Sequence, residues 1–287
     1  MTLKPIESGS LKSVVRAVVP RGLRNWLRSP SKSARWLWDA SRFQLGLTER
    51  LLLPRNWTLV CHPHAYSVTH QAQIADLEQR EEFENFLLQC NEQMFLFDIG
   101  AHFGVFSLAA AHFGGNAVAI DPSPIATRMI ARQCGLNGLT NKVRIMRAAV
   151  SDELGVVHMI NSGVFSDGYF RVIPGRAKSD LTTIQAVTID RLVALFGVPT
   201  HIKIDVEGQE AAVLRGGRTS IDKSSPILFV ELHNEMIRSE GRDPALALEE
   251  LARLGYNTFE PAGPAIDRDA ILQRPIVRVV ATRATHI

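Results

Sequence analysis

The sequence has little of what marks small secreted proteins or membrane-spanning proteins. Its three cysteines lie far apart among 287 residues, so neither a disulfide framework nor a cysteine-rich zinc site is indicated, and a reducing compartment fits best. No run of about 18 apolar residues occurs, which excludes a transmembrane helix. With 46% hydrophobic and 21% charged residues, the composition is that of a globular protein able to bury a sizeable core. We expect a cytoplasmic protein.

Positive charge is concentrated at the start of the chain. Residues 1–56 carry eleven Lys and Arg against three acidic side chains, a net charge of +8, whereas the rest of the chain carries −5. An acidic body makes a nucleic-acid partner unexpected. The basic segment contains Trp26, Trp36, Trp38 and Phe43 at roughly helical spacing, as in an amphipathic helix that contacts an anionic membrane surface. It could equally pack on the body as a lid or dimer arm, and the oligomeric state stays open.

From Met94 onward, short apolar runs alternate with helical segments. The predicted strands are residues 94–99, 116–120, 143–146, 156–160, 184–187, 201–204, 227–230, 256–259 and 276–281. The predicted helices are residues 105–113, 125–136, 189–196, 209–214 and 244–254. Before them we expect a loop that contains His and Pro (57–73) and then a polar helix (74–90). Strands without strict polar alternation, separated by helices, indicate a doubly wound α/β fold. We expect a basic helical extension (1–56), a connecting segment and helix (57–93), and an α/β domain (94–287).

The first motif is DIGAHFG, residues 98–104, at the end of the first predicted strand. Ligands of open α/β sheets bind beyond the carboxyl ends of the strands, where Gly100 and Gly104 would let the backbone approach closely. Asp121 ends the next strand, where a carboxylate can accept hydrogen bonds from ribose hydroxyls. The G-x-G-x-x-G fingerprint is absent, and the carboxylate of Asp98 would repel a pyrophosphate. The pattern favours S-adenosylmethionine over NAD; the alternative is a glycine turn and a capping acid without a ligand.

A second motif lies at the end of the strand predicted at residues 201–204. It delivers Asp205 and Glu207, and Gly208 opens the turn into a helix. Two neighbouring carboxylates raise the pKa of one of them, as catalytic sites often require. The alternative for Glu207 is that it caps the following helix.

The next strand supplies Glu231 and His233 to the same edge. Asp205, Glu207 and His233 are therefore candidate general bases. Oxygen and imidazole ligands suit Mg, Mn or Zn, so Asp205 with Glu231 or His233 could hold a divalent metal. Spacing alone does not assemble three ligands, and we do not expect a metal.

Together these blocks resemble the FkbM family of methyltransferases. The blocks are DIGAHFG (98–104), AIDPSP (119–124), AVSD (149–152), KIDVEGQEAAVLRGG (203–217) and VELH (230–233). The resemblance covers about residues 94–260, and it implies a Rossmann-like class I fold with a mostly parallel seven-stranded sheet. It further implies an S-adenosylmethionine-dependent enzyme that O-methylates a hydroxyl of a sugar, glycan or natural product.

The resemblance also assigns roles to residues. It places the cofactor against Asp98, Gly100, Ala101, His102, Gly104, Asp121, Pro122, Val150 and Ser151. It places the reacting centre near Asp205 and Glu207. His102 stands where the family usually has Asn, and Asp121 where Glu is commoner. Because the His102 difference affects the cofactor loop, the alternative function is a catalytically silent cofactor-binding module in a glycan-assembly complex. Residues 161–182 are a candidate acceptor loop.

Overall fold

The computed structural model describes residues 38, 41–42, 44–161, 170–172 and 182–283. Most of the basic segment and most of the candidate acceptor loop lie outside the described residues, as do the predictions made for them. The chain divides into two units, residues 1–47 and 48–287, and everything below concerns the second. Within the described part of the chain, no helix is both long and apolar enough to cross a membrane.

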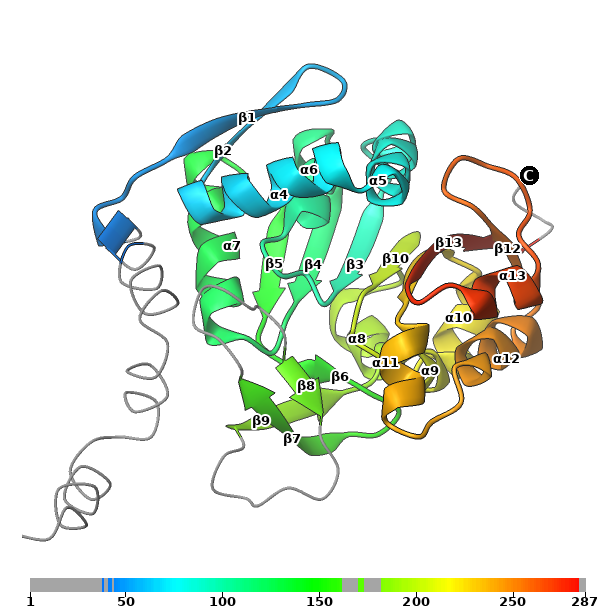
Figure 1. Cartoon of the computed structure of the whole chain (residues 1–287). Coiled ribbons are helices and arrows are strands. Elements are labelled where there is room, and N and C mark those ends of the chain that lie inside the picture. The colour runs from blue at the N-terminus through cyan, green and yellow to red at the C-terminus, as the bar shows by residue number, and fades with distance from the viewer. Residues whose placement is uncertain (1–37, 39–40, 43, 162–169, 173–181, 284–287) are drawn as a thin grey trace, which may run out of the picture. The chain divides into compact units, whose positions relative to one another are not determined.

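The centre of the second unit is a seven-stranded sheet (Figure 1). Its strands, in spatial order, are β12 (Asn257–Phe259), β13 (Val277–Thr282), β11 (Ile227–Leu232), β10 (His201–Ile204), β3 (Phe95–Ile99), β4 (Asn116–Ile120) and β5 (Val143–Met146). From β11 to β5 all neighbours pair in parallel, and β13 pairs antiparallel with both β11 and β12. The predicted α/β class and the mostly parallel seven-stranded sheet are confirmed.

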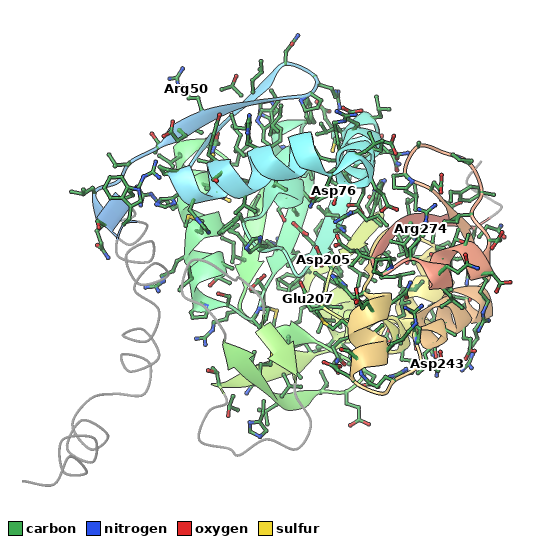
Figure 2. All side chains as sticks on the ribbon, in the orientation of Figure 1. Arg50, Asp76, Asp205, Glu207, Asp243 and Arg274 are labelled. Carbon is green, nitrogen blue, oxygen red and sulfur yellow. The ribbon has the colours of Figure 1, made fainter. Side chains whose placement is uncertain are left out.

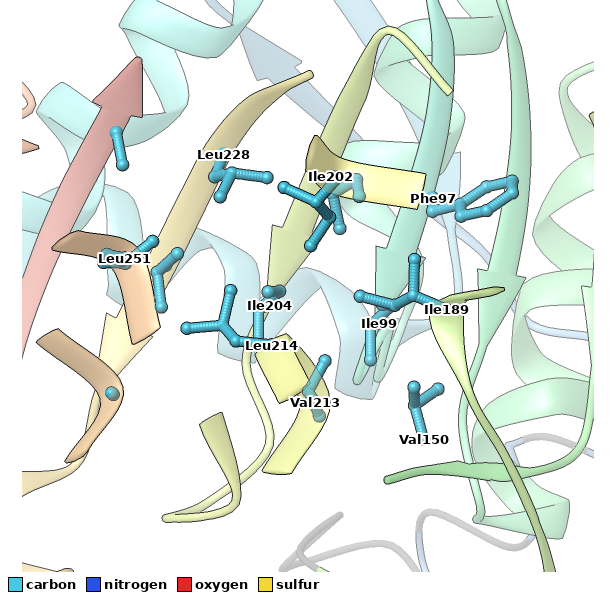
Figure 3. Packing of buried hydrophobic residues seen from close by; sticks show 14 of the residues in the cluster. Phe97, Ile99, Val150, Ile189, Ile202, Ile204, Val213, Leu214, Leu228 and Leu251 are labelled. Atoms are coloured by element: carbon cyan, nitrogen blue, oxygen red, sulfur yellow. The ribbon is translucent and has the colours of Figure 1, made fainter. Parts of the chain in front are cut away.

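An apolar core fills one face of this sheet. The helices on that face are α8 (Ile189–Phe196), α9 (Glu210–Arg215), α10 (Arg218–Ser224) and α12 (Ala245–Arg253). Ile202 and Ile204 of β10 pack there with Val213 and Leu214 of α9, all of them fully buried (Figure 3). Because side chains alternate along a strand, Lys203 points to the opposite face.

Two further helices cover that opposite face, α5 (Leu77–Gln89) and α6 (Val105–His112). The ring centroid of Phe106 lies 5.3 Å from that of Phe83 and 4.9 Å from that of Phe86, and Phe86 in turn lies 5.4 Å from Phe229 of β11. This aromatic layer joins α5 to α6 and to β11. The remaining helices are α4 (Pro63–Ala75), α7 (Pro124–Leu136), α11 (Asn234–Ser239) and α13 (Arg268–Gln273).

The prediction for residues 57–73 as a loop was wrong. They form β2 (Trp57–Cys61), paired with β1 (Glu49–Leu53), and most of α4. Trp57, Leu59 and Cys61 point inward, and the side chain of Asn137 at the end of α7 bonds both the N–H and the C=O of Val60, at 2.9 and 2.7 Å. This hairpin, which spans the expected boundary between residues 56 and 57, is therefore fastened to the α/β body.

A second, smaller sheet follows β5 in the chain. Its order is β6 (Ala149–Val150), β9 (Thr182–Val187), β7 (Gly155–Asn161) and β8 (Phe170–Val172). Ser151, directly after β6, donates its N–H to the C=O of Val187 at 2.9 Å. The sequence predicts strands close to β7 and β9, but not that they form a separate sheet.

Candidate active site

Four acidic residues gather at the carboxyl ends of neighbouring strands. Asp98 lies in β3, Asp121 follows β4, Asp205 follows β10 and Glu231 lies near the end of β11. These strands are parallel, so their ends meet at one edge of the sheet. Figure 2 shows Asp205 and Glu207 together at this edge. The convergence that the sequence predicts is therefore present.

The loop after β3 is tied to the end of β4. Gly100 and Ala101 both donate their N–H groups to the C=O of Ile120, at 2.9 and 3.1 Å. One carboxylate oxygen of Asp121 accepts from the N–H of His102 at 2.8 Å, and the other accepts from the N–H of Ser123 at 2.7 Å. Asp121 is thus held in one orientation at the carboxyl edge of the parallel strands.

His102 occupies a backbone conformation that few residues tolerate. Its φ is +49°, in the left-handed region where Asn, Asp and His are enriched among non-glycine residues. Its ring lies 3.8 Å from that of Phe103, and burial lowers the pKa of His102 to about 4, so the ring is neutral near pH 7. The bond to Asp121 comes from the backbone, so histidine in place of the family's usual Asn leaves that bond intact.

The two aspartates beside this loop suit a cationic ligand. Asp98 accepts from the N–H and the hydroxyl of Ser107, at 3.1 and 2.7 Å, which anchors the first turn of α6. Burial raises the pKa of Asp98 to about 6 and that of Asp121 to about 7. Among the described residues, neither carboxylate forms an ion pair with a basic side chain. A ligand that brings an ammonium, a sulfonium and ribose hydroxyls, as S-adenosylmethionine does, therefore fits these groups.

The other residues expected at the cofactor lie in the same loops. Ala101 belongs to the loop after β3, and Pro122 precedes the N-cap of α7. Val150 ends β6, and Ser151 follows it. Val150 is buried, and the Ser151 hydroxyl bonds Asp152 at 3.1 Å. The structure thus places every expected residue in a loop or strand end, and their contact with a cofactor stays a prediction.

Asp121→Asn should weaken S-adenosylmethionine binding by about 10- to 100-fold, because a hydrogen bond to a charged group contributes about 1.5–3 kcal/mol. The substitution keeps the shape of the side chain, removes its charge and replaces one of the two oxygens that accept from the N–H groups of His102 and Ser123. Calorimetry with S-adenosylmethionine checks this, and Asp269→Asn, on an exposed helix, is the matched control. Equal affinities of a well-folded Asp121→Asn variant and the wild type would contradict the assignment.

The loop after β3 and the turn after β10 come into contact at Gly100. A Cβ on Gly100 would lie 1.7 Å from the backbone oxygen of Asp205, and its φ is +80°. Gly104 has φ +74°, and a Cβ there would lie 2.9 Å from the side chain of Ile130 in α7. The absence of a side chain at Gly100 and Gly104 therefore lets segments of the protein pack closely together, and the approach of a ligand to this backbone stays a prediction.

His233 stands at the centre of the acidic groups. Glu210, at the start of α9, accepts from His233 Nδ1 at 2.8 Å and from the N–H of Gly208 at 2.8 Å. His233 Nε2 lies 3.8 Å from Asp205 Oδ1, 3.8 Å from Glu207 Oε2 and 3.7 Å from Glu231 Oε1. Burial alone would lower the pKa of His233, but the Glu210 hydrogen bond and the surrounding carboxylates outweigh it and raise the pKa to about 9. His233 is therefore a cation near pH 7.

Glu207 has the properties of a general base near neutral pH. It sits on the turn after β10 with φ +51°, a strained conformation of the kind that clusters at functional sites. Burial raises the pKa of Glu207 to about 7, against the opposing effect of the nearby His233. Its side chain is 16% exposed, so part of it remains accessible, and that of Asp205 is 34% exposed. Of the three predicted bases, Glu207 fits best.

Glu210 is the site residue that the sequence analysis missed. Its side chain is fully buried and orients His233 in the way a carboxylate orients the histidine of a catalytic triad. The available signal was its position three residues after Glu207, in the first turn of the predicted helix.

Asp205, Glu231 and His233 also form the trio that the sequence suggests for a metal. One ligand atom from each lies within 4.8 Å of the others. Both oxygens of Glu231, however, accept hydrogen bonds from Arg278, each at 3.0 Å. A divalent cation at this trio would compete with that guanidinium.

Comparisons with known proteins place the chain in a family. The model of the methyltransferase FkbM domain matches residues 98–258, more than half of the chain. No curated protein matches. Among solved structures, the chain is similar to a methyltransferase FkbM from Methylobacillus flagellatus, with 16% identity and a TM-score of 0.46 over 76% of this chain and 53% of that one. It thus spans about half the length of that relative.

A second similar structure is an O-methyltransferase from Bacillus cereus in complex with SAH, with 11% identity and a TM-score of 0.43 over 76% of this chain and 88% of that one. Both likenesses are weak, and the assignment depends on the family model together with the parallel sheet. The chain belongs to the FkbM family of S-adenosylmethionine-dependent methyltransferases.

Proposed function

We propose that this chain transfers a methyl group to a hydroxyl of a sugar, glycan or natural-product acceptor, with Glu207 as the general base. The observation that supports this most is the position of Glu207. It is partly exposed at the catalytic edge, its pKa is about 7, and it lies 3.8 Å from the cationic His233. A base that titrates near the working pH combines availability with proton affinity.

The acidic residues at the carboxyl ends of the parallel strands would have separate roles. S-adenosylmethionine, when bound, supplies a methyl group already activated on a sulfonium. Asp121 would hold the ribose, and Asp98 would contribute negative charge near the methionine end. The acceptor hydroxyl would lie against Glu207, which would take its proton as the methyl group passes from sulfur to oxygen and S-adenosylhomocysteine is left. Holding the two partners in line supplies a large part of the rate enhancement.

His233 and Glu210 prepare Glu207 for this step. In its protonated form, His233 offsets the repulsion among Asp205, Glu207 and Glu231. One carboxylate oxygen of each lies less than 4 Å from His233 Nε2. Glu210 holds the ring through Nδ1 and also holds the N–H of Gly208, the residue next to the base. Glu210 therefore orients both the His233 ring and the turn that carries Glu207.

These protonation states predict a bell-shaped pH profile. Glu207 accepts a proton only when ionised, so kcat should rise as the pH increases through about 7. His233 stabilises the site only when protonated, so kcat should fall as the pH increases through about 9. Initial rates between pH 5 and 10, with stability controls at each pH, measure both limbs. A rate that keeps rising from pH 9 to pH 10 would contradict the role of cationic His233.

The function itself is tested with the full-length chain, S-adenosylmethionine and a panel of neutral glycosides, glycans and hydroxylated macrolides, by following S-adenosylhomocysteine. Mass spectrometry of the product identifies O-methylation by the added methylene mass and its position. Binding of S-adenosylmethionine without turnover on any acceptor would favour the catalytically silent module. We expect turnover to survive EDTA, since Arg278 already engages Glu231; abolition by EDTA and restoration by Mg²⁺ would show a metal at the trio.

A further inference from the structure

A layer of charged side chains is buried between α5 and the sheet. Lys203 of β10 lies 3.0 Å from Glu82 of α5 and 3.9 Å from Glu231 of β11, and all three are almost fully buried. The opposite face of the same strands is entirely apolar. The charge is therefore confined to the face under α5, directly behind the catalytic edge.

Arg278 of β13 is the central cation of this layer. It stands opposite Glu231 in the antiparallel pairing of β11 and β13. Its Nε and Nη2 donate to the two oxygens of Glu231, both at 3.0 Å, in the bidentate geometry that fixes a carboxylate most firmly. Glu231 Oε1 in turn lies 3.7 Å from His233 Nε2.

Arg278 is itself anchored from the other side. Asp76, the N-cap of α5, accepts from Arg278 Nη1 at 3.0 Å, and Glu78 accepts from the backbone N–H of Arg278 at 3.1 Å. Figure 2 shows Asp76 at the start of α5. These acids precede the part of the chain that matches the family model, and Arg278 follows it. The anchoring of Glu231 thus comes from outside the family-matched region.

Stability alone gives little reason for such a layer. Desolvation of buried ions offsets their attraction, so well-packed apolar residues of similar volume often serve stability equally well. What a buried bidentate pair does provide is a fixed position for the carboxylate. The residue fixed here, Glu231, is one of the three carboxylates around His233.

We propose that Arg278 is a positioning residue of the catalytic edge: anchored by Asp76 and Glu78 of α5, it fixes Glu231 against His233. The inference builds on the proposed function, because it gives the His233 cluster its geometry. Arg278 touches neither cofactor nor acceptor in this scheme and acts only through Glu231.

The test compares three variants of the full-length chain. Arg278→Met removes both the charge and the bidentate hydrogen bonds to Glu231, and Arg278→Lys keeps the charge but cannot form the bidentate pair. Arg274→Met is the matched control, because Arg274 also pairs with Glu78 but is 40% exposed. The first readout is the pair of ¹⁵N ring signals of His233 at fixed pH, assigned by their loss in His233→Gln. The second is kcat with the best acceptor of the panel, beside calorimetry with S-adenosylmethionine.

We expect Arg278→Met to move the His233 signals and to lower kcat by about 100-fold, the size that a misplacement of 1 Å can cost. KM and the affinity for S-adenosylmethionine should stay within twofold of the wild type. The kcat of Arg278→Lys should lie between that of the wild type and that of Arg278→Met. Arg274→Met should have the kcat and the His233 signals of the wild type.

Three outcomes would overturn the proposal. The first is a folded Arg278→Met variant whose His233 signals are unchanged. The second is an Arg274→Met variant whose His233 signals change as much as those of Arg278→Met. The third is full activity of Arg278→Lys, which would show that a positive charge suffices without the bidentate guanidinium. If Arg278→Met does not fold, the lysine variant decides. If the wild type methylates no acceptor, the proposed function fails, and the histidine signals still decide the role of Arg278.

Discussion

Replacing Glu207 with glutamine is expected to lower kcat by about 10²- to 10⁴-fold, the usual contribution of a general base. Glutamine keeps the size of the side chain but cannot accept the proton of the acceptor hydroxyl. Because Glu207 lies on the turn after β10 and not in the loop that holds Asp121, the affinity for S-adenosylmethionine should stay unchanged. Steady-state kinetics with the best acceptor and calorimetry with the cofactor separate the two effects.

The pH profile sharpens this expectation. The acidic limb of the wild-type profile is assigned to Glu207, with a pKa of about 7, so Glu207→Gln should lose that limb as well as the rate. Asp205→Asn should also lower turnover, since Asp205 is the other partly exposed carboxylate beside His233, but it should keep the limb. Glu235→Gln, an exposed acid on α11, is the control. A folded Glu207→Gln variant that retains the limb would contradict the role of Glu207 as the base.

The strands of the large sheet could be predicted because buried parallel strands are continuous apolar runs. Residues 116–120, 143–146 and 201–204 were predicted with the bounds that the structure shows. The segment around Cys61-His62-Pro63 misled because proline interrupts most helices. Pro63 is the first residue of α4, the position where its missing N–H is not needed. The inward alternation of Trp57, Leu59 and Cys61 was the signal that went unused.

The site was predictable where it depends on strand ends and unpredictable where it depends on side-chain direction. Asp205, Glu207 and His233 were expected together because parallel strands end at one edge. The position of Glu210 three residues after Glu207 places it near the site, but the sequence does not say that its side chain turns back to His233. Arg278 is 47 residues from Glu231 in sequence, and only a single charge within the apolar run of β13 indicates a buried partner.

Gly100→Ala is expected to destabilise the protein more than any other single methyl group added at the site. The new Cβ would lie 1.7 Å from the backbone oxygen of Asp205, and this backbone cannot move freely because the N–H of Asp205 bonds the C=O of Ile99 at 2.9 Å. The residue would also have to keep φ at +80°. We expect a loss of more than about 4 kcal/mol. For a unit of this size, that corresponds to a fall in Tm of about 10 °C or more.

Gly241→Ala separates the two causes of that loss. Gly241 has φ +71°, but a Cβ there would meet nothing within 4 Å, so alanine costs only the left-handed backbone, about 1–2 kcal/mol. Chemical denaturation of both variants beside the wild type gives the difference, which measures the contact between the cofactor loop and the turn of Asp205. Equal losses in the two variants would mean that the loops do not touch as described. A much larger loss in Gly100→Ala would show that cofactor loop and catalytic turn form one rigid unit, so that a shift in either displaces the other.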